Sequence, residues 1–183
     1  MKLRYVLVTL ALTCCCTFIS AQPPGGLTKE GDTYRHEASK SSVKVSKDWE
    51  EIDTKGVVRQ PHLALRKAFG GIDVLITWTK LQDPAFIKFD EVVELELNQL
   101  TQTYGKEKVA KKEPLTIDNK SVAVIEIGEG PDRNGKQVGV VYLIDAGPDA
   151  KDRWKLKMRV IMNKSSQSDG MKAVSELLKQ IQW

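Results

Sequence analysis

Apolar residues recur with helical spacing in two segments of the chain. From Phe89 to Tyr104 they fall three or four positions apart, and glutamate and amide side chains occupy positions between them. This pattern predicts an amphipathic helix with one buried face and with Gly105 just beyond its end. A second stripe predicts a helix close to the C-terminus, capped by Ser168 or Asp169. Its apolar positions are Met171, Val174, Leu177, Leu178 and Ile181.

Alternating apolar and polar residues predict strands before the first helix. The segments 33–37, 41–45 and 63–67 are short, whereas the segment 72–78 alternates over a longer stretch. Gly70-Gly71 stands between the last two segments. A glycine pair in this position predicts a hairpin turn, so these two strands are expected to pair side by side.

Three segments after the first helix predict long strands of two kinds. Segments 122–127 and 138–144 carry apolar residues on both alternating faces, which predicts central strands covered on each side. In the segment 153–162, basic residues alternate with apolar ones. This alternation predicts one buried face, or an edge strand protected by its charges. The segment 106–113 is highly charged and is interpreted as a connector.

The predicted order of elements is strands, helix, three strands, helix. Strands that are apolar on both faces need cover on both faces, and the two helices can supply it. The chain is therefore predicted to have an α+β fold, with a mainly antiparallel sheet and helices packed on both faces as an α/β/α sandwich. No internal repeat or second linker interrupts residues 33–183, which are predicted to form a single domain.

This order of elements resembles the PsbP-like fold over residues 41–183. The likeness comprises an opening segment, the middle helix, the three long strands and the terminal helix; the opening segment is Val43-Lys44-Val45-Ser46-Lys47-Asp48-Trp49. The superfamily includes photosystem extrinsic proteins, a nuclear-transport factor that binds Ran, and DcrB-type bacterial envelope proteins. The resemblance implies a mostly non-catalytic accessory or binding role, and it brings no motif of ligand residues onto this sequence.

The N-terminal segment has the three parts of a secretory signal peptide. Lys2 and Arg4 precede an apolar run, and the small residues Ser20 and Ala21 precede a polar segment rich in Pro and Gly. This pattern predicts export, with cleavage after Ala21. An uncleaved anchor is the less favoured alternative, because the run is shorter than the ~20 residues of a membrane-spanning helix. Residues 22–32 are then predicted to be a flexible leader.

All the cysteines lie inside this N-terminal segment, at Cys14, Cys15 and Cys16. A mature chain without them has no disulfide, thiolate nucleophile or cysteine metal site. Attachment of lipid to one of them is the poorer alternative, because Thr13 stands where bacterial lipoproteins normally have Gly, Ala or Ser before the first modified cysteine. The predicted location is therefore the periplasm or the extracellular space.

The charge of the chain is nearly balanced. There are 28 Lys and Arg against 24 Asp and Glu, and cleavage removes Lys2 and Arg4, which leaves an excess of two positive charges. Domains that bind nucleic acid usually concentrate a larger excess. A nucleic-acid partner is therefore not predicted. No cofactor is predicted either, because the sequence carries no complete binding motif for one.

Several segments carry residue types that could support catalysis or ligand binding, but none contains a complete motif. Residues 130–136 have the glycine and lysine spacing of a phosphate loop, yet Gln137 replaces the metal-binding hydroxyl and a strand follows, so Asn134-Gly135 is interpreted as a hairpin turn. The chain has no Gly-x-Ser-x-Gly nucleophile elbow that could act with a histidine, so His36 and His62 are interpreted as surface residues.

Two other patterns have a simpler structural interpretation. The acidic loop with Asp145, Asp149 and Asp152 is interpreted as turn chemistry rather than a calcium site, because its spacing matches no EF-hand. Asn119 and Asn163 each begin a glycosylation sequon, which matters only in a eukaryotic source.

Two surfaces remain as candidate sites. The first is a basic row that would contact an anionic surface, such as phospholipid head groups or an acidic partner, and it consists of Arg153, Lys155, Lys157 and Arg159. A second basic group, at Lys106, Lys108, Lys111 and Lys112, is diluted by glutamates. The other candidate is an apolar pocket between sheet and helix, lined by Trp78, Tyr142 and Trp154.

The function favoured by these observations is that of an exported, non-enzymatic accessory or binding protein, whose partner is an unknown protein or envelope component. A carrier of a small apolar ligand is the alternative, and an enzyme is the least favoured reading.

Overall fold

The computed structural model describes residues 26–54, 60–67, 70–82, 87–132, 135–146 and 152–183. Their elements confirm the predicted α+β class, and every strand pair among them is antiparallel. The predicted signal peptide, residues 1–21, lies outside this part of the chain. None of the helices described is both long and apolar enough to cross a bilayer.

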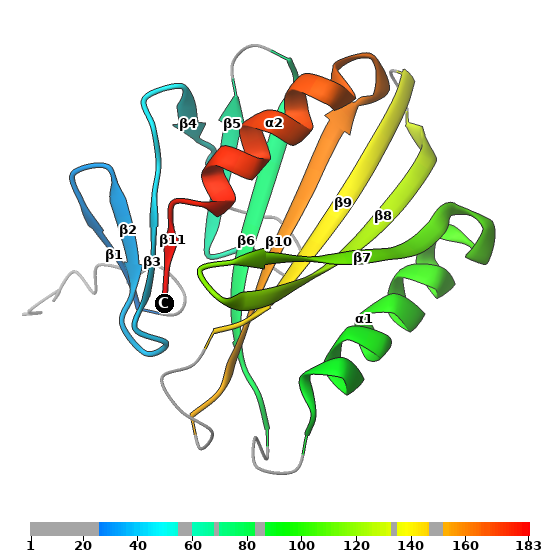
Figure 1. Cartoon of the computed structure of the whole chain (residues 1–183). Coiled ribbons are helices and arrows are strands. Elements are labelled where there is room, and N and C mark those ends of the chain that lie inside the picture. The colour runs from blue at the N-terminus through cyan, green and yellow to red at the C-terminus, as the bar shows by residue number, and fades with distance from the viewer. Residues whose placement is uncertain (1–25, 55–59, 68–69, 83–86, 133–134, 147–151) are drawn as a thin grey trace, which may run out of the picture.

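Within the described ranges, seven strands form the large central sheet (Figure 1). Their order is β4-β5-β6-β10-β9-β8-β7. The bounds are β4 Trp49–Glu51, β5 Leu63–Lys67, β6 Ile72–Lys80, β7 Val109–Ile117, β8 Lys120–Asp132, β9 Gly135–Asp145 and β10 Trp154–Asn163. Strand β10 pairs with β6 on one side and with β9 on the other. The basic segment is therefore a central strand, and the alternative of an edge strand is wrong.

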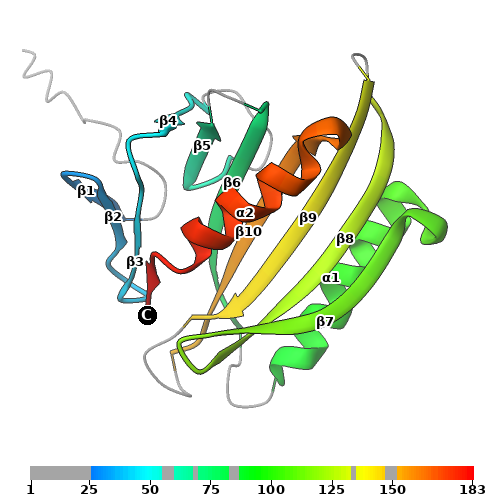
Figure 2. The ribbon, with the colours of Figure 1, turned by 45° about the horizontal axis from the view of Figure 1, so that its top comes forward.

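A different helix covers each face of this sheet, as Figure 2 shows. Helix α1, Phe89–Tyr104, packs on one face in a core cluster that includes Val93 and Ile125. Helix α2, Gln167–Leu178, lies over the other face in a larger cluster that includes Leu177 and Val124. Strand β8 contributes to both clusters, and so does β9. The prediction that these two strands are covered on both sides is confirmed.

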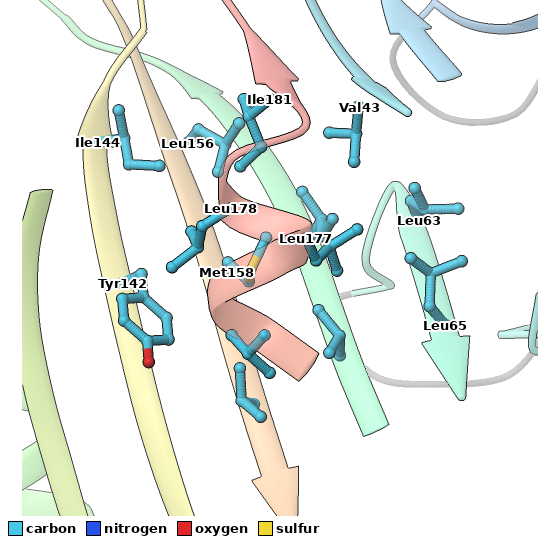
Figure 3. Close-up of a cluster of buried hydrophobic side chains, with 14 of the residues drawn as sticks. Val43, Leu63, Leu65, Tyr142, Ile144, Leu156, Met158, Leu177, Leu178 and Ile181 are labelled. Atoms are coloured by element: carbon cyan, nitrogen blue, oxygen red, sulfur yellow. The ribbon is translucent and has the colours of Figure 1, made fainter. Parts of the chain in front are cut away.

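The larger cluster, shown in Figure 3, places Leu177 and Leu178 of α2 against Met158 of β10. All three side chains are almost completely buried, and burying such a side chain stabilises the fold by ~1.5 to 3 kcal/mol. Gly170 lets the helix approach the sheet closely, because a Cβ at this position would lie 2.7 Å from the Met162 sulfur. Helix α2 is thus an integral part of the core, as its apolar stripe predicts.

A small second sheet packs beside α2, with the order β1-β2-β3-β11. Its strands are β1 Leu27–Glu30, β2 Thr33–His36, β3 Ser41–Lys44 and β11 Ile181–Gln182. Strand β1 corrects the expectation of a structureless leader up to residue 32: it has one partly buried apolar side chain, Leu27, and exists through its pairing with β2.

The C-terminal helix is shorter at its end than its apolar stripe predicts. Its last residue is Leu178, and Ile181 instead pairs with Val43 of β3. The start also differs from the predicted cap, because Ser166 is the N-cap residue and Gln167 begins the helix. The stripe itself is confirmed, since Ile181 is fully buried in the same cluster as Leu177.

The charged connector predicted for residues 106–113 is wrong beyond its first residues. A single 3-10 turn, η1 Lys106–Lys108, leads into β7, which pairs with β8 at the edge of the sheet. Most side chains of β7 are exposed, so no apolar alternation announces the strand. Charged side chains on an exposed edge hinder pairing with other chains, which explains the composition.

Both predicted hairpins are consistent with the strand pairing. Gly70 and Gly71 have φ angles of 106° and 60°, which favour glycine, and they lie between the antiparallel strands β5 and β6. Asp132 of β8 pairs with Gly135 of β9, so the two antiparallel strands stay paired up to the residues that flank 133–134. Residues 133–134 themselves lie outside the described part of the chain. No helix follows this loop, and the phosphate-loop reading is therefore excluded.

Candidate functional site

The basic row of β10 lies on the face of the sheet that α1 covers. The ammonium groups of Lys155 and Lys157 lie 3.2 and 3.1 Å from the two carboxylate oxygens of Glu96 on α1. Glu96 is only 5% exposed. Burial by itself would raise the pKa of its carboxyl, but the two lysines outweigh burial, and the pKa is lowered. Glu96 therefore stays ionised, and the two lysines share its single negative charge.

The other two members of the row have different partners. Arg153 forms an ion pair of 2.6 Å with Asp145 and donates to the carbonyl of Ile87. Arg159 donates to the hydroxyl of Tyr104 and lies 5.7 Å from the centre of its ring. Among the described residues, Arg159 is the one cation of the row without a carboxylate partner. Contact between this row and an anionic surface stays a prediction, and three of the four cations already lie beside a carboxylate.

A buried aromatic cluster joins the small sheet to the large one, and it corrects the interpretation of His36 as a surface residue. His36 is 1% exposed, and its ring stacks on Trp78 with a centroid distance of 5.1 Å and an interplanar angle of 6°. Trp154 and His62 meet the same ring edge-on, at 4.9 and 5.7 Å. Because β2 lies over the core, its alternate residues Tyr34 and His36 both point inward.

A chain of hydrogen bonds accompanies this cluster. The Ser39 hydroxyl lies 2.8 Å from His36 Nδ1 and 2.7 Å from the Ser41 hydroxyl, which accepts a bond of 2.7 Å from the Trp78 indole. A serine beside a histidine is the geometry of an activated nucleophile. Here both side chains are at most 2% exposed, so a substrate could reach them only if the core opened. The chain satisfies buried polar groups and supports a structural role.

His62 lies at the edge of the same cluster and is only partly buried. Its Nδ1 accepts a hydrogen bond of 3.2 Å from the backbone N–H of Trp78. Burial lowers the pKa of the imidazole. This histidine is therefore neutral at physiological pH and anchors β6 through its acceptor nitrogen.

The residues of the predicted apolar pocket belong to one packed core. Trp78 and Tyr142 are 2% and 1% exposed, and Trp154 packs against the same cluster. The Tyr142 hydroxyl lies 3.7 Å from the Met171 sulfur, and burial, with a smaller effect of Glu126, raises the pKa of Tyr142 to about 12. These side chains fill the space between sheet and helix. Carriage of an apolar ligand there stays a prediction and requires their displacement.

Three open grooves are lined by other residues of the described chain. One lies between α2 and the segment from β3 to β4, with a volume of about 510 Å³. Another lies at the C-terminal end of α1, with a volume of about 370 Å³, and a further one of about 320 Å³ lies between α2 and the end of β7. The grooves, unlike the predicted pocket, are accessible to a partner without rearrangement of the core.

The largest of these, which we call the Trp49 groove, has an apolar floor and a charged rim. Trp49, Ala173 and Leu177 contribute the apolar surface. The rim carries charges of both signs from Asp32, Lys44, Lys47, Asp48, Lys67 and Glu176. Lys67 lies over the Trp49 ring, 5.8 Å from its centre. This groove was not predicted from the sequence, although the segment 43–49, with charges of both signs and a final Trp, was the available signal.

The remaining candidate residues have ordinary structural roles where they are described. Asp145 pairs with Arg153, and Asp152 lies 2.9 Å from Lys80. Asp149 lies outside the described residues, within which no group of three His, Cys, Asp or Glu side chains is placed to hold a metal ion. Asn119 occupies the turn between β7 and β8 with a φ of 63°, and Asn163 ends β10.

Comparison with known proteins defines the class of fold. No family model matches the chain, and no curated protein sequence is significantly similar to it. Among solved structures, LpqN of Mycobacterium tuberculosis, involved in cell envelope biogenesis, superposes with a TM-score of 0.57 at 12% identity over 78% of this chain and 82% of that one. Cyanobacterial PsbP (CyanoP) from Synechocystis sp. PCC 6803 has a TM-score of 0.54 at 8% identity, covering 86% and 92% of the two chains.

The Ran-binding protein Mog1p of Saccharomyces cerevisiae is similar as well, with a TM-score of 0.51 at 12% identity and coverage of 85% of this chain and 96% of that one. The chain thus has a PsbP-like α+β fold, as the order of its elements predicts. At these identities the likeness concerns the fold alone.

Proposed function

We propose that this chain is an exported, non-enzymatic binding protein whose partner is another protein, and that the Trp49 groove receives a segment of that partner. The observation that carries the proposal is the composition of the groove, in which an apolar floor is surrounded by three lysines and three acidic residues. Protein interfaces commonly combine a buried apolar or aromatic centre with a polar rim.

The balance of charge around the groove favours a polypeptide over other partners. An anionic membrane or a nucleic acid would be matched by a rim of one sign. Here Lys44 lies 4.0 Å from Asp32, and Lys47 is followed directly by Asp48. A protein segment with charges of both signs and an apolar side chain for the floor complements this surface.

The structural neighbours support the proposal at the level of fold. Mog1p is a Ran-binding protein, and LpqN is involved in cell envelope biogenesis. A fold shared with such proteins makes a binding role in the envelope a reasonable expectation, although functions are carried by sites rather than by folds.

Export is the second part of the proposal. It rests on the signal-peptide pattern of residues 1–21 and predicts a mature protein that begins at Gln22. Intact mass and N-terminal sequencing of the protein recovered from outside the cytoplasm would test this. A start at Cys14, Cys15 or Cys16 with added lipid would show a lipoprotein instead, and an unprocessed chain in the cytoplasm would contradict export.

Site-specific photo-crosslinking in the native cells tests the partner site. A p-benzoylphenylalanine at Lys47 or Lys67 lines the groove, whereas the same residue at Lys172, whose side chain is 78% exposed on α2, lies outside its lining. We expect one discrete protein adduct from the groove positions and none from the control position. The adduct should weaken when Asp48→Lys is introduced beside a crosslinker at Lys67. Equal adducts from all positions, or none from any, would refute the proposed site.

A further inference from the structure

The groove at the C-terminal end of α1 differs in character from the Trp49 groove. Its volume is about 370 Å³, and its lining is mainly apolar. Ile127 of β8 and Ile161 of β10 contribute to it, on either side of Gly139 in β9, with which both pair in the sheet. Tyr104, the last residue of α1, also lines it.

A guanidinium without an acidic partner lines this groove. Arg159 donates to the Tyr104 hydroxyl and lies over the Tyr104 ring, and no carboxylate of the described residues lies within ion-pair distance of it. Its Nε atom is buried and has no hydrogen-bond acceptor in the part of the chain that the structure describes. A buried charged donor without an acceptor destabilises the fold, so a ligand that supplies an acceptor is favoured there. The other three cations of the basic row, by contrast, each lie beside a carboxylate.

The charged side chains that line the groove are both basic. Lys108 joins Arg159 in the lining, to which no Asp or Glu of the described chain contributes. The acidic residues of the adjoining part of β8 have cations of their own: Glu126 lies 3.0 Å from Lys112, and Glu129 pairs with Lys164. The groove therefore complements an anion.

Two glycines determine the depth of the groove. A Cβ at Gly139 would lie 3.4 Å from the Ile127 side chain, and a Cβ at Gly128 would lie 3.4 Å from the Lys108 carbonyl oxygen. Any larger side chain at these positions would occupy the space between the sheet and the end of α1. The apolar floor stays open because both positions lack a side chain.

We propose that this groove, which we call the Arg159 groove, binds a small organic carboxylate with a compact apolar body. The carboxylate accepts hydrogen bonds from the Arg159 guanidinium, Lys108 supplies a second positive charge, and the apolar body lies against Ile127 and Ile161. A planar guanidinium matches the geometry of a carboxylate, and the volume falls in the range of ~300 to 1,000 Å³ of small-molecule sites. Tyr104 is a positioning residue that holds the guanidinium.

Amide NMR of the mature protein tests this proposal with hexanoate as the probe. The backbone amides of Gly128 and Gly139 report on the groove directly. We expect both signals to shift saturably with hexanoate and to respond at least about tenfold more weakly to 1-hexanol, which keeps the apolar body and lacks the charge. Inorganic phosphate, which keeps the charge and lacks the apolar body, should also bind more weakly.

Matched variants connect the binding to the guanidinium. Arg159→Gln should weaken hexanoate binding at least about tenfold. Arg66→Gln, which removes an exposed arginine paired with Asp73 on another part of the sheet, should leave it unchanged. Lys108→Gln should weaken it by a smaller factor, and this half-buried position outside the core provides a test should Arg159→Gln fail to fold.

Three results would overturn the proposal. Absence of saturable shifts with hexanoate would show that the groove is not a binding site. Equal binding of hexanoate and 1-hexanol would show that the positive charge does not contribute to binding. Binding of phosphate as tightly as hexanoate would show that the apolar floor does not contribute to affinity. None of these outcomes depends on the Trp49 groove, so the two proposals fail or stand separately.

Discussion

Replacement of Glu96 by glutamine should destabilise the protein far more than the same change at an exposed ion pair. Glu96 is 5% exposed and accepts from both Lys155 and Lys157, whose side chains are 17% and 32% exposed. Glutamine keeps the shape of the side chain but removes its charge. The two ammonium groups are then left beneath α1 without a counter-ion, which is the costly way to break a buried ion pair.

The expected loss of stability follows from the two hydrogen bonds that Glu96 accepts from Lys155 and Lys157. A hydrogen bond to a charged group is worth ~1.5 to 3 kcal/mol. The loss is reduced because the glutamine amide still offers one acceptor, and because Lys157 is exposed enough to move its ammonium group toward water. We therefore expect a loss of about 2 to 3 kcal/mol in the free energy of unfolding, which corresponds to a fall of roughly 4 to 12 °C in Tm for a domain of this size.

Urea unfolding followed by tryptophan fluorescence measures this loss, and Glu94→Gln is the matched control. Glu94 lies on the same helix and pairs with Lys111 at 2.7 Å, but both side chains are about half exposed. Exposed pairs contribute ~0.2 to 1 kcal/mol, so the control should change stability by less than about 1 kcal/mol. A loss for Glu96→Gln no larger than that of the control would refute the reasoning.

The pH dependence gives a second check on the same residue. The folded pKa of Glu96 lies below its ordinary value of 4.5, so the ionised carboxylate stabilises the folded state above that pH. The contribution is lost as the pH falls through the folded pKa. The difference in stability between the wild type and Glu96→Gln should therefore be full at pH 6 and should shrink below pH 4.5. A constant difference over this window would contradict the assignment.

Further predictions concern the core and the basic row. Ser41→Ala should cost about 1 to 3 kcal/mol in urea unfolding, because the Trp78 indole N–H loses its acceptor. Gly170→Val should lower stability by about 1 to 3 kcal/mol by forcing the Met162 side chain away from α2. Leu177→Asp should prevent stable folding, seen as loss of a cooperative thermal transition, since it places a charge in the core. Co-sedimentation with anionic vesicles tests the basic row, and no binding at low salt would refute its contact with such a surface.

The spacing of apolar residues was sufficient to predict each helix or strand that buries one of its faces in the core. The stripe from Phe89 to Tyr104 predicts helix α1 with its observed ends, and the doubly apolar segments predict β8 and β9 as central strands. Local pattern failed at β1 and β7, which bury few side chains and exist because a neighbouring strand offers its backbone groups. Ile181 fitted the helical stripe, yet its backbone pairs with Val43 more than a hundred residues away.

For the candidate sites too, the sequence predicted local features and the tertiary structure decided which of them come together. The sequence by itself identified the alternation that places Lys155, Lys157 and Arg159 on one face of a strand. Which of these charges is paired depends on α1, since Glu96 reaches Lys155 and Lys157, whereas Arg159 donates to Tyr104. The sequence likewise predicted the class of fold, because the apolar stripe that each helix or strand must bury can be recognised within its own segment. Burial of His36, pairing of charges and formation of the two grooves were decided by tertiary structure, because each brings together side chains from elements far apart in the chain.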